Sequence, residues 1–284
     1  MKPSLSFRHI ISLLLLALFT SQTAGAAIGG LKSDLKDDDE SSEEWQGIRT
    51  NFFQKRNIDT KQPAILIDIP KRAEFGATVP VSIRAQVAQT AQNHIKKMYL
   101  VVDKNPSAVA AVYTLAPDIG QADIETRIRV NEYSHVRVIA EMNNGKLSMA
   151  SKYVKVSGGC SAPPNKDAAQ HKRDLGKIKW RLPDKIFANQ TTPVQLQVSH
   201  PNNTGFEMDH ITVMTIPPHY VSKMSVTYSG KPVISAETDF SISESPYIAF
   251  NFVPKGDGEL KAEIIDSKEM KFEKSAPVKL ANTK

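Results

Sequence analysis

Residues 79–87 read Val-Pro-Val-Ser-Ile-Arg-Ala-Gln-Val, and this stretch decides the fold class. Apolar residues alternate in it with polar residues or proline, and most of the apolar ones are β-branched. Period two of this kind is typical of a strand with one face buried. The alternation recurs at 124–130, 136–140 and 154–156, and later at 194–198, 226–228, 248–252 and 260–264. We therefore predict an all-β protein with a β-sandwich in each half.

Turn sequences separate these runs and support the same fold class. Three of them lie in the first half: Lys104-Asn105-Pro106, Ala116-Pro117-Asp118 and Asn143-Asn144-Gly145. Two in the second half are predicted to be hairpin turns: Tyr228-Ser229-Gly230-Lys231 and Lys255-Gly256-Asp257-Gly258. Such turns bring neighbouring strands of a sandwich together every 8–12 residues.

The N-terminal residues predict export. Lys2 and Arg8 precede a nearly unbroken apolar run over 10–19, and Ala24-Gly25-Ala26 has the small residues that a signal peptidase needs. The run is well short of the ~20 residues that span a bilayer as a helix. We therefore expect 1–26 to be a cleaved signal peptide, the mature protein to be periplasmic, and no membrane anchor to be present.

The chain after this leader is slightly basic and begins with an acidic stretch. The formal net charge of the 284 residues is +6, and loss of Lys2 and Arg8 leaves +4. The basic residues are dispersed, which argues against nucleic acid as a partner. Residues 27–44 contain seven acidic side chains and are predicted to be a disordered tail. Apolar residues at helix-like spacing from Trp45 to Asn57 predict a short amphipathic helix on the first domain.

The strand pattern stops at residues 158–174, which we interpret as an arm or linker between domains at 45–157 and 175–284. The arm begins with Gly158-Gly159-Cys160 and contains two prolines and several charges. Cys160 is the chain's one cysteine, so it cannot form an intramolecular disulfide. A lone cysteine in an exported protein is a candidate reactive thiol or intermolecular partner.

We expect Cys160 to be an exposed, mobile nucleophile. It lies outside any apolar strand, and Gly158 and Gly159 would give the arm flexibility. About four residues separate Val156 from the sulfur, so the thiol would reach on the order of 13 Å from the strand end. A disulfide-linked dimer through Cys160 is left open, as is the effect of neighbouring basic residues on the thiol pKa.

Several stretches resemble the two subunits of the SoxYZ sulfur carrier. Those similar to SoxY are Ile67-Asp68-Ile69-Pro70, Phe75-Gly76-Ala77-Thr78-Val79-Pro80-Val81, Asn105-Pro106, Thr126-Arg127-Ile128-Arg129 and Val154-Lys155-Val156-Ser157-Gly158-Gly159-Cys160. Those similar to SoxZ are His200-Pro201, Thr204-Gly205, Ile216-Pro217-Pro218-His219-Tyr220, Tyr228-Ser229-Gly230-Lys231-Pro232-Val233 and Pro246-Tyr247-Ile248-Ala249-Phe250-Asn251-Phe252. Together they resemble the fused SoxYZ-like proteins associated with quinoprotein dehydrogenases.

The resemblance implies two immunoglobulin-like sandwiches joined by a flexible cysteine-bearing linker. It implies a carrier rather than an enzyme, with a covalent adduct on Cys160 that passes between periplasmic oxidoreductases of the sulfur-oxidation or quinoprotein type. The chain departs from the family at one place. In SoxY the cysteine lies in a Gly-Gly-Cys-Gly-Gly sequence at a free C-terminus, whereas Ser161-Ala162-Pro163-Pro164 follows Cys160 here and stiffens one side of the arm.

Two other functions are weighed against a covalent carrier. One is a non-covalent adaptor or structural partner of an exported dehydrogenase. The other is copper binding by His and Met side chains of the second domain, namely His200, His210, His219, Met208, Met214 and Met224. Their spacing matches no defined ligand motif, and no cofactor fingerprint or catalytic triad is recognised, so we predict no metal, no cofactor and no catalytic residue.

Overall fold

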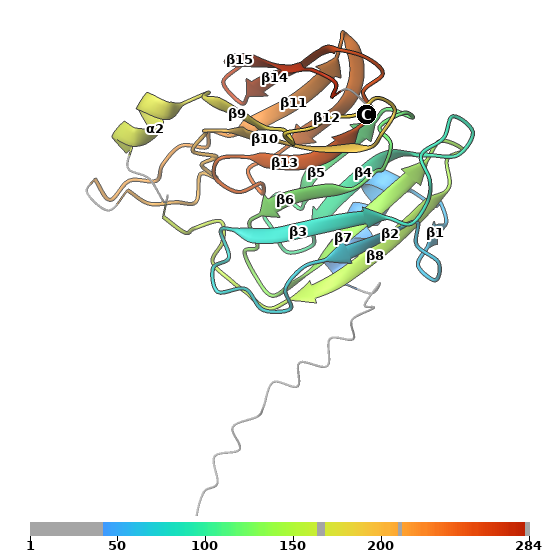
Figure 1. Ribbon diagram of the computed structural model, residues 1–284. Helices are drawn as coiled ribbons and strands as arrows, with labels where there is room; N and C mark the ends of the chain where they lie inside the picture. The colour runs from blue at the N-terminus through green and yellow to red at the C-terminus, as the bar shows by residue number, and fades with distance from the viewer. Residues whose placement is uncertain (1–41, 164–167, 210–211, 282–284) are drawn as a thin grey trace, which may run out of the picture. The chain divides into compact units, whose positions relative to one another are not determined.

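The fold was analysed in a computed structural model that describes residues 42–163, 168–209 and 212–281 (Figure 1). The predicted signal peptide and most of the acidic tail lie outside the described residues. None of the helices in the described part of the chain is long and apolar enough to cross a membrane.

The first half forms a sandwich of eight strands, as its alternating pattern predicts. Their burial alternates along each strand, as in Val79–Ala85, where Val79, Val81 and Ile83 face the core. The strands are β1 (Ile58–Asp59), β2 (Ile65–Asp68), β3 (Val79–Ala85), β4 (Ile95–Val102), β5 (Val109–Leu115), β6 (Ile124–Ile128), β7 (Ser134–Met142) and β8 (Leu147–Val154).

The second half forms a sandwich of seven strands. The strands are β9 (Ile178–Arg181), β10 (Thr192–Val198), β11 (Val221–Tyr228), β12 (Lys231–Thr238), β13 (Tyr247–Phe252), β14 (Gly258–Asp266) and β15 (Lys271–Val278). The predicted hairpin turn at 228–231 joins β11 to β12, with Ser229 and Gly230 both at positive φ. The predicted hairpin at 255–258 is wrong, because the strands that it connects, β13 and β14, lie in different sheets.

Both sheets run without interruption from the first half into the second. The nine-stranded sheet has the order β1-β8-β7-β4-β5-β12-β11-β14-β15, and the six-stranded sheet has the order β2-β3-β6-β13-β10-β9. The halves meet where β5 pairs with β12 over five residue pairs and where β6 pairs with β13 at Glu125 and Ala249. One hydrophobic cluster fills the space between the sheets in both halves (Figure 1). Edge-to-edge pairing thus covers the strand edges that the two sandwiches would otherwise expose at their junction.

The predicted N-terminal helix is confirmed as α1 (Glu43–Ile48), which continues into a π-helical turn at Arg49–Phe53. The Ser42 side chain caps it by accepting the N–H of Trp45 at 3.2 Å. Trp45 stacks over the guanidinium of Arg137 on β7, 4.7 Å from the ring centroid, and Phe53 meets Tyr99 of β4 edge-on. The helix therefore covers the outward face of the nine-stranded sheet.

The segment predicted to be a linker contains structure of its own. Ala168–Asp174 forms a short helix, α2, which the sequence pattern did not predict. His171 on α2 lies 3.2 Å from a carboxylate oxygen of Glu244 in the second half, measured from Nε2. This contact fixes the C-terminal side of the arm to the second sandwich.

Continuous sheets should make the two halves unfold together. The two tryptophans, Trp45 and Trp180, report on one half each, so W180F leaves a reporter in the first half and W45F one in the second. In each variant we expect urea denaturation followed by fluorescence and by far-UV circular dichroism to give the same midpoint. A fluorescence transition that separates from the dichroism transition in either variant would contradict this coupling.

Candidate functional site

Cys160 is buried, and the expectation of an exposed thiol is wrong for this structure. Its residue exposure is 1%. The arm does not project from the end of β8 but lies against Val130 and Asn131 of the first half and against Thr204 of the second. The burial arises from contacts with residues far along the chain, which an inspection of the local sequence does not reveal.

Gly158 and Gly159 are fixed by hydrogen bonds in this closed arm. The N–H of Gly158 donates to the carbonyl of Asn131 at 2.8 Å, and that of Gly159 donates to the carbonyl of Val130 at 3.1 Å. Gly159 also packs directly on the backbone of Gly76, where any Cβ at residue 159 would collide with the Gly76 carbonyl. In this conformation Gly159 therefore serves close packing, and its role in arm flexibility stays a prediction.

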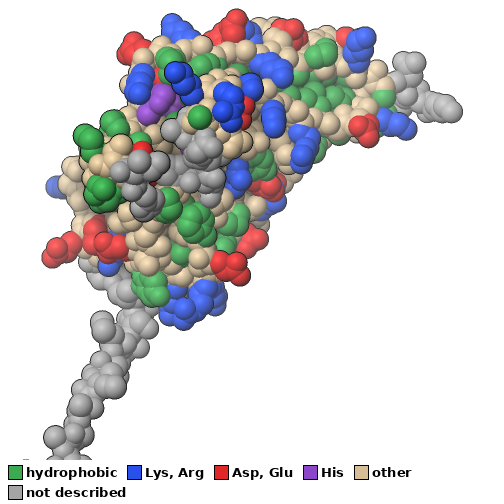
Figure 2. Space-filling model, turned by 90° about the vertical axis from the view of Figure 1, so that its left-hand side faces the viewer, with side chains coloured by type: hydrophobic (Ala, Val, Ile, Leu, Met, Phe, Trp, Pro, Cys, Tyr) green, Lys and Arg blue, Asp and Glu red, His purple; other side chains and the backbone are tan. Residues whose placement is uncertain are grey.

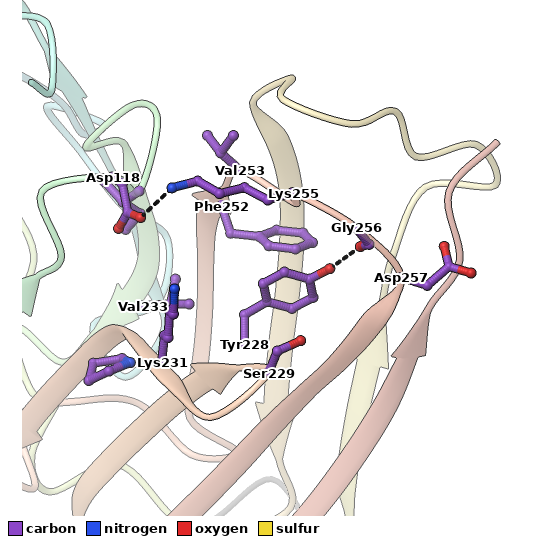
Figure 3. Close-up of a pocket in the computed structure, with 12 residues that line it drawn as sticks. Asp118, Tyr228, Ser229, Lys231, Val233, Phe252, Val253, Lys255, Gly256 and Asp257 are labelled. Atoms are coloured by element: carbon purple, nitrogen blue, oxygen red, sulfur yellow. Dashed lines mark hydrogen bonds and ion pairs between the residues drawn. The ribbon is translucent and has the colours of Figure 1, made fainter. Parts of the chain in front are cut away.

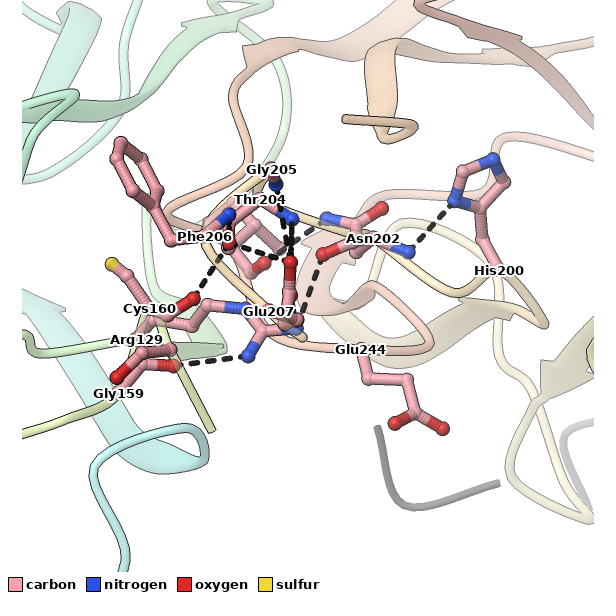
Figure 4. Close-up of polar contacts among 12 residues, drawn as sticks. Arg129, Gly159, Cys160, His200, Asn202, Thr204, Gly205, Phe206, Glu207 and Glu244 are labelled. Carbon is pink, nitrogen blue, oxygen red and sulfur yellow. Dashed lines mark hydrogen bonds and ion pairs between the residues drawn. The ribbon is translucent and has the colours of Figure 1, made fainter. Parts of the chain in front are cut away.

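Arg129 links the arm to both halves of the molecule (Figure 4). Its side chain is 3% exposed and donates through Nη1 to the Gly159 carbonyl at 3.0 Å and through Nη2 to the Asn202 carbonyl at 3.1 Å. A carboxylate oxygen of Glu207 lies 3.6 Å from Nη2. Burial lowers the pKa of Arg129, and the negative charge of Glu207 opposes this effect. The guanidinium thus holds the arm through carbonyl groups while Glu207 balances its charge.

Thr204 forms the second contact between the arm and the second half (Figure 4). Its hydroxyl oxygen lies 2.6 Å from the Cys160 carbonyl and 2.7 Å from Oε2 of Glu207, so its one proton is shared between two acceptors. The Glu207 carboxylate in turn accepts the N–H groups of Thr204 and Gly205. This side-chain cluster places a hydroxyl donor directly against the backbone of the cysteine.

The closed arm suppresses the reactivity of the thiol. Burial raises the pKa of Cys160 to about 11, while the Arg129 charge lowers it and the Glu207 charge raises it. At that pKa about one thiol in ten thousand is a thiolate at pH 7, and the thiolate is the nucleophile. In this conformation Cys160 is therefore a neutral, buried thiol.

The second half contains a buried cluster of two candidate copper ligands, His200 and His219, with Asp266. His219 Nε2 lies 2.8 Å from Oδ2 of Asp266, and His200 Nε2 lies 3.5 Å from the same oxygen. Nδ1 of His200 accepts the N–H of Asn202, so a neutral His200 ring carries its proton on Nε2. Burial and the neighbouring His219 lower the pKa of His200 to about 4. The hydrogen bonds therefore favour a structural cluster, because a metal at Nε2 would need the tautomer that Asn202 opposes.

The other candidate metal ligands do not join this cluster. Met224 is buried in the hydrophobic core, whereas Met208 and Met214 are exposed on the loop between β10 and β11. His210 lies outside the described residues. The structure thus brings His200 and His219 together, and it adds Asp266, which the sequence analysis did not consider.

A small pocket is lined by residues of both halves (Figure 3). It has a volume of about 160 Å³ and is lined by the rings of Tyr228 and Phe252, with Asp118 of the first half at its rim. Asp118 is paired with Lys255, 3.3 Å apart, and the Tyr228 hydroxyl donates to the Gly256 carbonyl. Asp118, Lys255 and the Tyr228 hydroxyl are therefore engaged with one another or with the backbone.

Sequence reasoning missed the residues that hold the arm closed. Arg129 lies in an alternating strand pattern, where it was interpreted as an ordinary solvent-facing side chain. Thr204 and Glu207 do have a local signature, because Thr-x-x-Glu is the spacing at which a carboxylate reaches back to a backbone N–H. The contact of Thr204 with Cys160, 44 residues away, has no such signature.

Family models match two adjoining parts of the chain. The model described as sulfur oxidation protein SoxY matches residues 49–160, so its match ends at the cysteine. The model described as sulphur oxidation protein SoxZ matches residues 180–277. A search of curated proteins finds no match.

Comparison with solved structures gives weaker likenesses. The sulfur carrier protein SoxY from Chlorobium limicola f thiosulfatophilum has 24% identity and a TM-score of 0.34, and the alignment covers 40% of this chain and 91% of that one. A superoxide reductase (neelaredoxin) from Ignicoccus hospitalis has 16% identity and a TM-score of 0.31, with coverage of 34% and 81%. TM-scores this low do not establish a shared fold.

Weakening the Thr204 contact should expose the thiol. In T204V the hydroxyl that bonds the Cys160 carbonyl is lost, at a net cost of about 1 kcal/mol to the closed arm, or a factor of about five in opening. We expect the rate of Cys160 alkylation by iodoacetamide at pH 7 to rise about fivefold.

Two controls separate this effect from general destabilisation. T204S retains a hydroxyl and should keep the wild-type rate, and T212V changes an exposed threonine of the same loop without touching the arm. A T204V rate equal to that of wild type, or an equal rise in T212V, would show that Thr204 does not hold the arm.

Proposed function

This chain belongs to the SoxY and SoxZ families, and on that premise we propose that Cys160 carries a sulfur-linked intermediate between partner enzymes. The SoxY region precedes the SoxZ region in one polypeptide. The observation that carries the proposal is the position of Cys160. It ends the SoxY region on a short segment that is held in place by a few hydrogen bonds rather than by a strand ladder.

The segment can open without disturbing either sandwich. It is fastened at the Gly158 and Gly159 N–H groups and at the Gly159 and Cys160 carbonyls. Each such bond contributes roughly 1 kcal/mol net, since water replaces it when the arm opens. The arm would then swing from Val156, which closes the strand pattern of the first half.

Opening would also activate the thiol. In water a cysteine has a pKa of about 8.5, so a few per cent is thiolate at pH 7, which is about three hundred times the fraction in the closed arm. The thiol would therefore be reactive in the open arm, where an enzyme can receive it, and inert in the closed arm, which shields it from oxidants in the solvent. The closed arm would keep the thiol unreactive, and the open arm would present it to a partner enzyme.

The loading step is the formation of a sulfur–sulfur bond. The Cys160 sulfur bonds to the terminal sulfur of an anionic inorganic sulfur compound, and the S–H bond of the thiol breaks. The thiol proton goes to water, and the two electrons that are released go to a partner oxidoreductase of the sulfur-oxidation or quinoprotein class. The carrier itself supplies no redox group to the step.

The predicted leader supports a periplasmic location for this exchange. An exported protein with one cysteine meets oxidants and other thiols, and a buried resting thiol limits unwanted disulfides. The same burial disfavours a disulfide-linked dimer in the closed form, because the sulfur of one copy cannot reach that of another.

An intact-mass measurement tests the proposal. Protein purified from its native compartment without reductant should contain a fraction whose mass is raised by one or more sulfur atoms or oxidised sulfur groups, and reduction should remove the increment. C160S, purified in the same way, should lack the increment and keep the same circular dichroism spectrum.

The adaptor hypothesis makes the opposite demand. A uniformly free thiol, unchanged after incubation with inorganic sulfur compounds and the cognate oxidoreductases, would overturn covalent carriage. If C160S also sustained the full activity of those enzymes, the protein would be a non-covalent adaptor.

A further inference from the structure

A basic groove crosses the outward face of the six-stranded sheet beside the arm. It is formed by residues of four strands from both halves, and it has a volume of about 490 Å³. Its lining consists of Arg127 on β6, Lys179, Trp180 and Arg181 on β9, Gln195 and Gln197 on β10, and Tyr247 on β13. Figure 2 shows one face of the molecule, on which Lys and Arg side chains are scattered among hydrophobic and acidic ones.

Strand pairing arranges these side chains in two parallel rows. In one row Lys179 pairs with Gln197 and Gln197 with Tyr247, and the guanidinium of Arg127 lies 5.5 Å from the Tyr247 ring centroid. In the other row Arg181 pairs with Gln195 and Gln195 with Ala249. Ala249 pairs in turn with Glu125 of β6 and lines the neighbouring hollow rather than this groove.

The positive charges of the groove are not neutralised within the described chain. Arg84, at the neighbouring hollow, is paired with both Asp123 and Glu125. By contrast, no ion pair engages Arg127, Lys179 or Arg181 among the residues that the structure describes. Three uncompensated cations on a concave surface attract an acidic partner and raise its association rate.

The spacing of the cations favours an extended acidic surface over a small anion. Lys179 and Arg127 are three strand spacings apart, which is about 14 Å. A single oxyanion cannot contact both, whereas an acidic loop or rim of a protein can. The ring of Tyr247 and the side chains of Arg127 and Arg181 are also of the kinds that are enriched in protein interfaces.

The groove adjoins the segment that bears the thiol. Arg127 on β6 and Arg129, just beyond the end of that strand, are two residues and about 7 Å apart along the chain, and Arg129 holds the Gly159 carbonyl. We infer that this basic groove is the docking surface for an acidic face of the enzymes that exchange cargo with Cys160. The role of these partners rests on the proposed carrier function, whereas the affinity of the groove for acidic protein does not.

Binding of a synthetic acidic peptide tests the inference. The probe is a fluorescein-labelled 12-residue peptide rich in Asp and Glu, and its anisotropy is measured with the purified protein at low and at physiological salt. We expect K179E/R181E to raise the Kd at least about tenfold and salt to weaken binding to the wild type. The matched control is K152E/K223E, which makes the same change in net charge on the nine-stranded sheet and should leave the Kd within about twofold.

Three results would overturn the inference. If both double variants lost the same affinity for the peptide while their thermal midpoints stayed unchanged, the effect would be one of net charge in general. Displacement of the peptide by thiosulfate at an ionic strength where chloride has no effect would indicate a small-anion site. A single-stranded oligonucleotide that binds as tightly as the peptide, and that loses as much affinity in K179E/R181E, would show that the groove is not specific for protein. C160S should bind the peptide as wild type does, so a failure of docking is distinguishable from a failure of covalent carriage.

Discussion

The closed arm depends on one buried cation. The Arg129 guanidinium contacts the arm at Gly159, the second sandwich at Asn202 and the charge of Glu207, and it comes from the end of a strand of the first sandwich. A buried charge is costly unless it is paired and hydrogen-bonded, so removing any of these partners would leave another uncompensated. The arm, the first half and the second half are therefore held in one arrangement by a group that none of them could bury alone.

This constraint explains why the two halves share their sheets. Arg129 can reach Asn202 because β6 and β13 lie side by side, and that pairing sets the distance between the end of the first half and the loop that carries Thr204. Two sandwiches joined only by a flexible linker would not hold the Asn202 carbonyl and the Glu207 carboxylate beside Arg129. The continuous sheets thus fix the positions of the residues from both halves that contact the segment bearing Cys160.

Period-two alternation made the strands and the fold class predictable. Stretches such as 79–87 have no other arrangement that buries their β-branched residues, and the Trp45 helix was equally clear from its spacing. The edge-to-edge pairing of β5 with β12 was not predictable, because an edge strand has the same pattern whether it meets solvent or another strand.

The candidate site was only half predictable, for a related reason. Cys160 stood out as the lone cysteine after two glycines, which is a local signal. Its burial depends on Thr204 and Glu207, and the sequence contains no sign of which distant loop covers a glycine-rich segment. The basic groove was hidden in the same way, since its cations come from β6 and β9, which only the fold brings together.

Hydrogen–deuterium exchange of the arm is the most direct test of a closed arm that opens locally. The relevant amides are those of Gly158 and Gly159, which bond to the carbonyls of Asn131 and Val130. We expect protection that is clear but weaker than that of strand β7, so that these amides exchange by local opening while the sheets stay folded. Full exchange at the first time point would show that the arm is not closed in solution. Exchange as slow as that of β7 would show that the arm opens only when the protein unfolds, and Cys160 could not then serve as a carrier.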